Sequence, residues 1–114
     1  MTINQLQKKI RLFRDERNWM QFHNHKDMAI ALAIEAAELQ ELFLWKKNNE
    51  IEEVAVTKKE RITEEIADIA VYLFELADNL GIDIPKAIDS KLMKNAHKYP
   101  VDKARGSSKK YTEL

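Results

Sequence analysis

The chain has only two glycines and two prolines among its 114 residues, so it offers few positions at which a tight turn can form. A β-rich fold depends on such turns and is nearly excluded. The sequence therefore predicts an all-α fold. Its length is that of one domain, and we expect a single domain over residues 1–114. With 45% hydrophobic residues, the chain is too apolar to be disordered.

Charge and composition exclude several classes of function. The 19 basic and 19 acidic side chains give zero net charge, which argues against a protein that binds nucleic acid through a basic face. The absence of cysteine excludes a disulfide framework, a thiolate metal site and a cysteine nucleophile. The first thirteen residues lack the apolar run of a signal peptide, and we expect a cytoplasmic protein without a membrane partner.

Apolar periodicity and the start and stop signals of helices predict four helices. Thr2 and Gln5 form a capping-box pattern before the first, and Thr57 and Glu60 form another before the third. Asp83 and Pro85 should open the fourth, with Gly81 ending the third. We expect helices at residues 3–18, 27–45, 57–80 and 83–99, a polar connection at 46–56 and a polar, extended arm at 101–114.

The second predicted helix is apolar on nearly all sides. Between Met28 and Trp45 the polar residues are only Glu35, Glu38, Gln40 and Glu41. Such a helix must be covered on most sides, and its carboxylates make it unsuited to span a bilayer. It is therefore expected to be the central helix of a four-helix bundle or to pack against a partner chain, so a monomer is not favoured.

Two pairs of carboxylates interrupt the apolar faces of the second and third predicted helices. They are Glu35-x-x-Glu38 and Glu65-x-x-Asp68, and residues three apart share a helix face. Half-buried carboxylates repel one another unless a cation or a proton compensates them. A site of oxygen ligands suits Mg²⁺, and the lack of a Glu-x-x-His pair disfavours a di-iron bundle. The alternative is a solvated helix face whose carboxylates pair with lysines.

Other side chains could complete a ligand site. Tyr72 follows Asp68 by one turn and shares its face, and a flat ligand could stack on Trp19 and Trp45 near helix ends. His23 is a candidate ligand-binding residue only if Trp19 lines a pocket. Core packing is the alternative for the aromatic residues. The fourth helix carries a polar stripe, which is either a solvated face or a cationic wall for phosphates: Lys91, Asn95 and Lys98.

Together these motifs resemble a known family. The segments that carry the resemblance are Trp19-Met-Gln-Phe22-His23, Glu35-Ala-Ala-Glu38 and Glu65-Ile-Ala-Asp68, with the second tryptophan and the Ser90-Lys91-x-x-x-Asn95 stripe. They are similar to the MazG-like all-α nucleoside triphosphate pyrophosphohydrolases, whose mark is ExxE followed by ExxD. The C-terminal residues look most like the dCTP pyrophosphatase branch.

The resemblance implies Mg²⁺-dependent hydrolysis of dCTP or a related (deoxy)nucleoside triphosphate to the monophosphate and pyrophosphate, as nucleotide-pool housekeeping. It also implies a homo-oligomer, dimer or tetramer. Ile10 stands where vertebrate relatives have a histidine at the base pocket, which implies a different or looser base selectivity. The implied roles are magnesium ligands and water activation for Glu35, Glu38, Glu65 and Asp68, a base pocket of Trp19, His23 and Trp45, and sugar or phosphate contacts by Tyr72, Lys91, Asn95 and Lys98.

Three alternatives stay open from the sequence. The first keeps the fold but makes the chain a broad-specificity enzyme that removes damaged or otherwise non-standard nucleotides. The second is a helical interaction module whose acidic cluster binds a metal for structure alone. The third is a nucleotide sensor that binds without hydrolysis.

Overall fold

The computed structural model describes residues 1–114, which are helical and contain no strand, so the predicted all-α class is confirmed. None of the helices is both long and apolar enough to cross a membrane. The chain divides into two compact units, residues 1–81 and 82–114, which are described separately. In chain order the elements are α1 (Ile3–Glu16), η1 (Met20–Phe22), α2 (His25–Glu41), η2 (Asn48–Glu50), α3 (Ile51–Thr57), α4 (Lys59–Asn79), α5 (Ile84–Lys98), α6 (Val101–Ala104) and η3 (Tyr111–Glu113).

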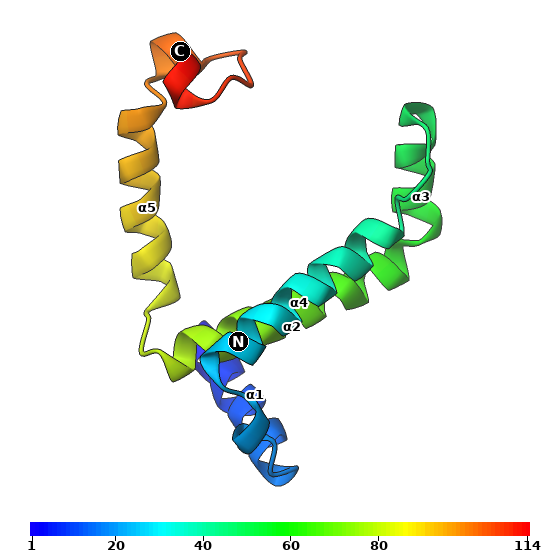
Figure 1. Ribbon diagram of the computed structural model, residues 1–114, viewed down its shortest axis with the longest axis vertical. Helices are drawn as coiled ribbons and strands as arrows, with labels where there is room; N and C mark the ends of the chain where they lie inside the picture. The colour runs from blue at the N-terminus through cyan, green and yellow to red at the C-terminus, as the bar shows by residue number, and fades with distance from the viewer. The chain divides into compact units, whose positions relative to one another are not determined.

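The first unit is built on the pairing of α2 with α4, which lie side by side and run in opposite directions (Figure 1). Helix α1 packs against α4, and side-chain contacts by Gln7, Arg11 and Arg14 fix this packing. Gln7 Nε2 donates to the carbonyl oxygen of Phe74 at 3.0 Å, and Arg11 Nη1 lies 2.7 and 2.8 Å from the two carboxylate oxygens of Asp78. The first unit thus holds three long helices, and the fourth predicted helix, α5, belongs to the second unit.

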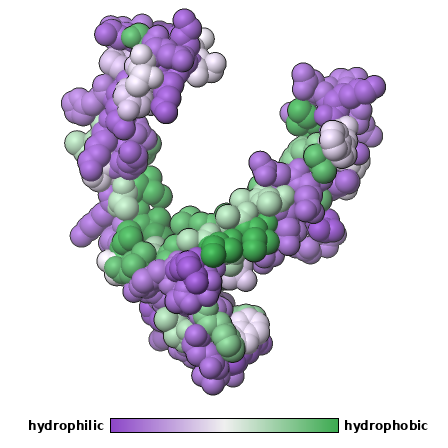
Figure 2. Space-filling model, viewed as in Figure 1, coloured by the Kyte–Doolittle hydropathy of each residue, from purple (hydrophilic) through white to green (hydrophobic).

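Little of the apolar surface of α2 is covered within this chain. Met28 is its one buried residue, whereas Ile30 and Ile34 are 50% and 54% exposed. Hydrophobic residues gather over the middle of the α2–α4 pair, while the end that carries α3 is mostly hydrophilic (Figure 2). The expectation that α2 is covered on most sides is therefore not met by the chain's own helices.

Several predicted helix signals act as expected. Thr2 and Gln5 form the capping box of α1, and the side chain of Asp83 accepts from the backbone N–H of Lys86 at the start of α5. Gly81 follows α4 with φ +68°, the left-handed conformation that glycine adopts without steric cost. The predicted helix termination before Pro100 is also confirmed, because α5 ends at Lys98.

Other boundaries were predicted wrongly. Thr57 does not cap α4. It is the last residue of α3, and its hydroxyl donates to the carbonyl of Glu53. The polar composition of residues 46–56 concealed α3, because glutamate is a good helix former and only Val54 of this helix is buried. Helix α2 ends at Glu41, short of Trp45, and α1 ends two residues early.

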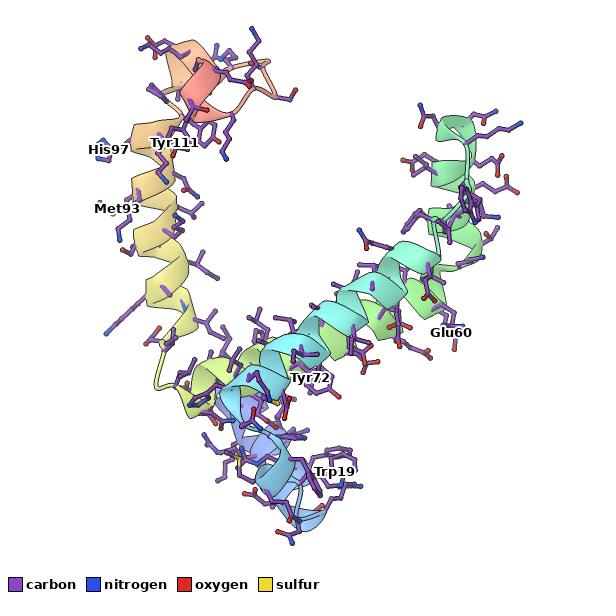
Figure 3. The ribbon with its side chains drawn as sticks, in the orientation of Figure 1. Trp19, Glu60, Tyr72, Met93, His97 and Tyr111 are labelled. Carbon is purple, nitrogen blue, oxygen red and sulfur yellow. The ribbon has the colours of Figure 1, made fainter.

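The second unit also corrects one expectation. Residues 101–114 form helix α6 and the turn η3 rather than an extended arm. The Tyr111 ring packs edge-on to Tyr99, with ring centres 6.0 Å apart, and Lys98 Nζ lies 4.9 Å from the centre of the Tyr111 ring. These aromatic and cation–π contacts stabilise the C-terminal residues against the end of α5. Figure 3 shows Tyr111 beside the end of that helix.

Replacing Asn24 with alanine should destabilise the protein by about 1 kcal/mol. Asn24 caps α2, since its Oδ1 accepts from the backbone N–H of Asp27 at 2.8 Å. Urea denaturation measures the difference. Asn49→Ala serves as the control, because Asn49 is exposed and its side chain makes no hydrogen bond, so a similar loss in both variants would contradict the assignment.

Candidate active site

The four predicted carboxylates occupy the interface between α2 and α4. Glu35 and Glu38 come from α2, and Glu65 and Asp68 come from α4. One carboxylate oxygen from each of Glu35, Glu38 and Glu65 lies within 4.8 Å of the other two. The fourth carboxylate, Asp68, is exposed and near enough for its charge to act on Glu35. The pairing of the two helices thus brings the two sequence motifs together.

The cluster carries uncompensated negative charge. Burial, followed by the hydrogen bond and charge of Glu38, the charge of Asp68 and a hydrogen bond to Glu65, raises the pKa of Glu35 to about 7. The Oε2 atoms of Glu35 and Glu65 are both buried without a hydrogen-bond partner. Arg61 reaches only the other oxygen of Glu65, at 3.5 Å. Buried acceptors of this kind require a proton or a cation.

These residues fit a hard divalent cation. The donor set consists of carboxylate oxygens, two of which have no other partner. Mg²⁺ is commonly bound by one or two carboxylates together with water and substrate phosphates. The carboxylate cluster therefore suits a divalent metal ion.

A pocket of about 140 Å³ adjoins the cluster, and Glu35 and Asp68 form part of its wall. It lies entirely within the first unit. Typical small-molecule sites measure about 300–1,000 Å³, so this pocket accommodates one part of a ligand, such as a single flat ring. Its other lining residues come from α1, α4 and the segment between α1 and α2: Ile10, Phe13, Arg14, Trp19, His23, Val71, Tyr72 and Glu75.

Aromatic side chains form one wall of this pocket. Trp19 packs edge-on to Phe13 with ring centres 5.8 Å apart, and the His23 ring is tilted at 47° to it. Trp19 remains 42% exposed, which leaves ring surface open to a ligand. Tyr72 and Trp19 lie on the same side of the first unit (Figure 3). Burial and the negative charges of Glu35, Asp68, Glu75 and Glu38 raise the pKa of the Tyr72 hydroxyl, so it stays a hydrogen-bond donor.

The structure does not bring every predicted site residue to this pocket. Trp45 does not line it. That residue is 91% exposed and has φ +64° in the segment after α2. Lys91, Asn95 and Lys98 all lie on α5, in the second unit, where Lys98 faces the Tyr111 ring. Their expected contacts with phosphates stay predictions.

Two charged pocket residues were missed by sequence reasoning. Glu75 is 3% exposed on α4, and Arg14 is 7% exposed on α1. Glu75 lies three residues after Tyr72 and seven after Asp68, so all three side chains share one face of the helix. Extending this face by one turn would have identified Glu75, whereas no local pattern distinguished Arg14 from the other basic residues of its helix.

Known proteins resemble the chain over most of its length. The dCTP pyrophosphatase 1 of Mus musculus is 43% identical over 104 residues, which are 90% of this chain and 61% of the relative. The Homo sapiens protein of the same name is 42% identical, and the match again covers 90% of this chain and 61% of the relative. The chain therefore spans about three-fifths of the length of these curated relatives.

A solved structure gives an independent comparison. The crystal structure of a pyrophosphatase from Archaeoglobus fulgidus DSM 4304 matches with a TM-score of 0.82 and 40% sequence identity, and the match covers 85% of this chain and 91% of that one. The MazG-like family matches residues 30–114, a range that contains both carboxylate motifs. The chain therefore belongs to the MazG-like family.

Proposed function

We propose that the chain hydrolyses a (deoxy)nucleoside triphosphate, with dCTP or a closely related dNTP as substrate, to the monophosphate and pyrophosphate. The observation that carries this proposal is the carboxylate cluster with two buried, unpartnered oxygens directly beside an aromatic pocket. The relatives named dCTP pyrophosphatase support the choice of nucleotide. We also propose that Mg²⁺ is the cofactor and that the working protein is a cytoplasmic homo-oligomer.

The reaction is an attack by water on the α-phosphorus. A bound Mg²⁺ would offset the charge of the triphosphate and lower the pKa of a neighbouring water molecule. Glu35 or Glu38 orients the water and takes its proton as the new phosphorus–oxygen bond forms. The bond between the α-phosphorus and the bridging oxygen breaks, and pyrophosphate leaves with that oxygen.

The pocket holds the base in this proposal. The Trp19 ring offers a stacking surface, and Tyr72, whose hydroxyl is a donor, lines the same pocket as Trp19 and Glu35. This position suits a contact with the sugar. The apolar Ile10 lines the same pocket and adds no hydrogen bond.

Pyrophosphate release from a panel of dNTPs and NTPs, each with Mg²⁺ and with EDTA, tests the proposal. We expect magnesium-dependent release that is fastest with dCTP. Hydrolysis in ¹⁸O-labelled water should place the label in the monophosphate, and label in pyrophosphate would contradict attack at the α-phosphorus. Similar rates across many bases would support a broad-specificity enzyme. Binding without release by the folded protein would support a sensor.

A further inference from the structure

A buried carboxylate that is not part of the metal cluster lines the base pocket. Glu75 is 3% exposed and lies on α4 among the pocket residues. Burying a charge is costly unless another group compensates it. Arg14 lines the same pocket, and its hydrogen bond with Asp15 and the charges of Asp15, Glu75 and Asp78 raise the pKa of its guanidinium. The lining of the pocket therefore includes side chains of opposite charge.

Glu75 also fixes the hydrogen-bonding state of His23. His23 Nδ1 lies 2.8 Å from Glu75 Oε2, and because a carboxylate oxygen only accepts, Nδ1 is the atom that donates. In a neutral imidazole this leaves Nε2 as an acceptor. The other carboxylate oxygen, Oε1, makes no hydrogen bond within the chain. When the imidazole is neutral, Glu75 Oε1 and His23 Nε2 are therefore two acceptors without a hydrogen-bond partner in the chain.

The rest of the pocket restricts what can meet these acceptors. Its volume of about 140 Å³ suits one ring, Trp19 supplies a flat face, and Ile10 and Val71 offer no hydrogen bonds. A base with an exocyclic amino group can donate hydrogen bonds to these acceptors. A carbonyl oxygen at the same position is itself an acceptor, so it would form no hydrogen bond with them. Arg14, whose Nε and Nη1 donate to Asp15 and Asn79, retains Nη2 as a donor for an acceptor on the ring.

We propose that Glu75 and His23 determine base selectivity, by accepting hydrogen bonds from the exocyclic amino group of a single-ring base, so that a cytosine nucleotide is taken and a uracil nucleotide is rejected. Glu75 thereby acts both by direct contact and as a positioning residue for His23. The inference rests on the proposed nucleotide-hydrolysing function and assigns its selectivity to residues outside the carboxylate cluster.

The test compares dCTP with dUTP. Their bases differ in the exocyclic group, amino in cytosine and carbonyl in uracil, and in the adjacent ring nitrogen, which accepts in cytosine and carries a proton in uracil. For the unaltered protein we expect kcat/KM to favour dCTP by about tenfold or more. Glu75→Gln keeps the size of the side chain but adds a donor, which can pair with a carbonyl. We expect this variant to lose about tenfold or more on dCTP and little or nothing on dUTP, so that the ratio falls to within about threefold.

A matched control and a second variant separate selectivity from folding. Glu64→Gln makes the same chemical change at an exposed position of α4 and should keep the dCTP preference. If Glu75→Gln fails to fold by circular dichroism, His23→Gln replaces it, because the side chain of His23 is 18% exposed and its loss removes the ring acceptor. An unchanged ratio in the folded variant, or equal losses on both substrates, would overturn the proposal.

Binding of dCMP and dUMP, measured by calorimetry without metal, separates this inference from the proposed function. Neither monophosphate can release pyrophosphate, so this measurement does not depend on catalysis. A preference for dCMP in a chain that hydrolyses no triphosphate would refute the proposed function and retain the base selectivity. Equal or undetectable binding of both monophosphates by the unaltered chain would overturn the selectivity, whatever the hydrolytic activity.

Discussion

Replacing Glu38 with glutamine should lower kcat for magnesium-dependent pyrophosphate release by about a hundredfold or more and leave the protein folded. Glu38 supplies one of the three clustered carboxylates, and an amide is a weaker ligand that cannot accept the proton of water. The same change removes one negative charge from beside Glu35. Without metal, we therefore expect Tm to rise by about 3 °C, because repulsion within the cluster is relieved.

Glu41→Gln is the matched control for this experiment. Glu41 is exposed at the end of the same helix and is not part of the carboxylate cluster. Both activity and metal-free Tm should stay close to those of the unaltered protein. A Glu38→Gln variant that retained full turnover would refute the catalytic assignment. A structural metal site would instead show a loss of stability in parallel with the loss of metal binding.

Stability of the metal-free protein should fall by about 1–2 kcal/mol between pH 5 and pH 8. The pKa of Glu35 is about 7 in the folded chain and 4.5 ordinarily, so folding favours the protonated form. This contribution is fully present below pH 4.5 and is lost as the pH rises through 7. The expected change is smaller than the full shift implies, because water reaches part of the site and screens its charges.

Magnesium should reverse this loss, because the cation and the proton compete for the same oxygens. Urea titrations at pH 5 and pH 8, at matched ionic strength, measure the effect. We expect the stabilisation by Mg²⁺ to be greater at pH 8. Glu35→Gln should flatten the dependence on pH, since it removes the titrating group. An equal gain from Mg²⁺ at both pH values would show that Glu35 does not share its proton site with the metal.

The helical class and the two pairs of carboxylates, each on one helix face, could be predicted because both depend on local pattern. Scarcity of glycine and proline disfavours a β-rich fold, and an i, i+3 spacing fixes which side chains share a face. The segment at 51–57 could not be assigned in this way, since its polar residues suit a helix as well as a loop. Likewise, the partnership of Glu75 with His23 joins residues 52 positions apart and depends on tertiary packing.

The incomplete covering of α2 has a consequence for how the chain reaches its folded state. Ile30 and Ile34 would lose their contact with water only by packing against another surface. If a second copy of the chain provides that surface, folding and association become one reaction. The equilibrium would then depend on the concentration of the chain, and dilution would favour unfolding. In a cell, the amount synthesised would set the fraction that is folded as well as the total quantity of the chain.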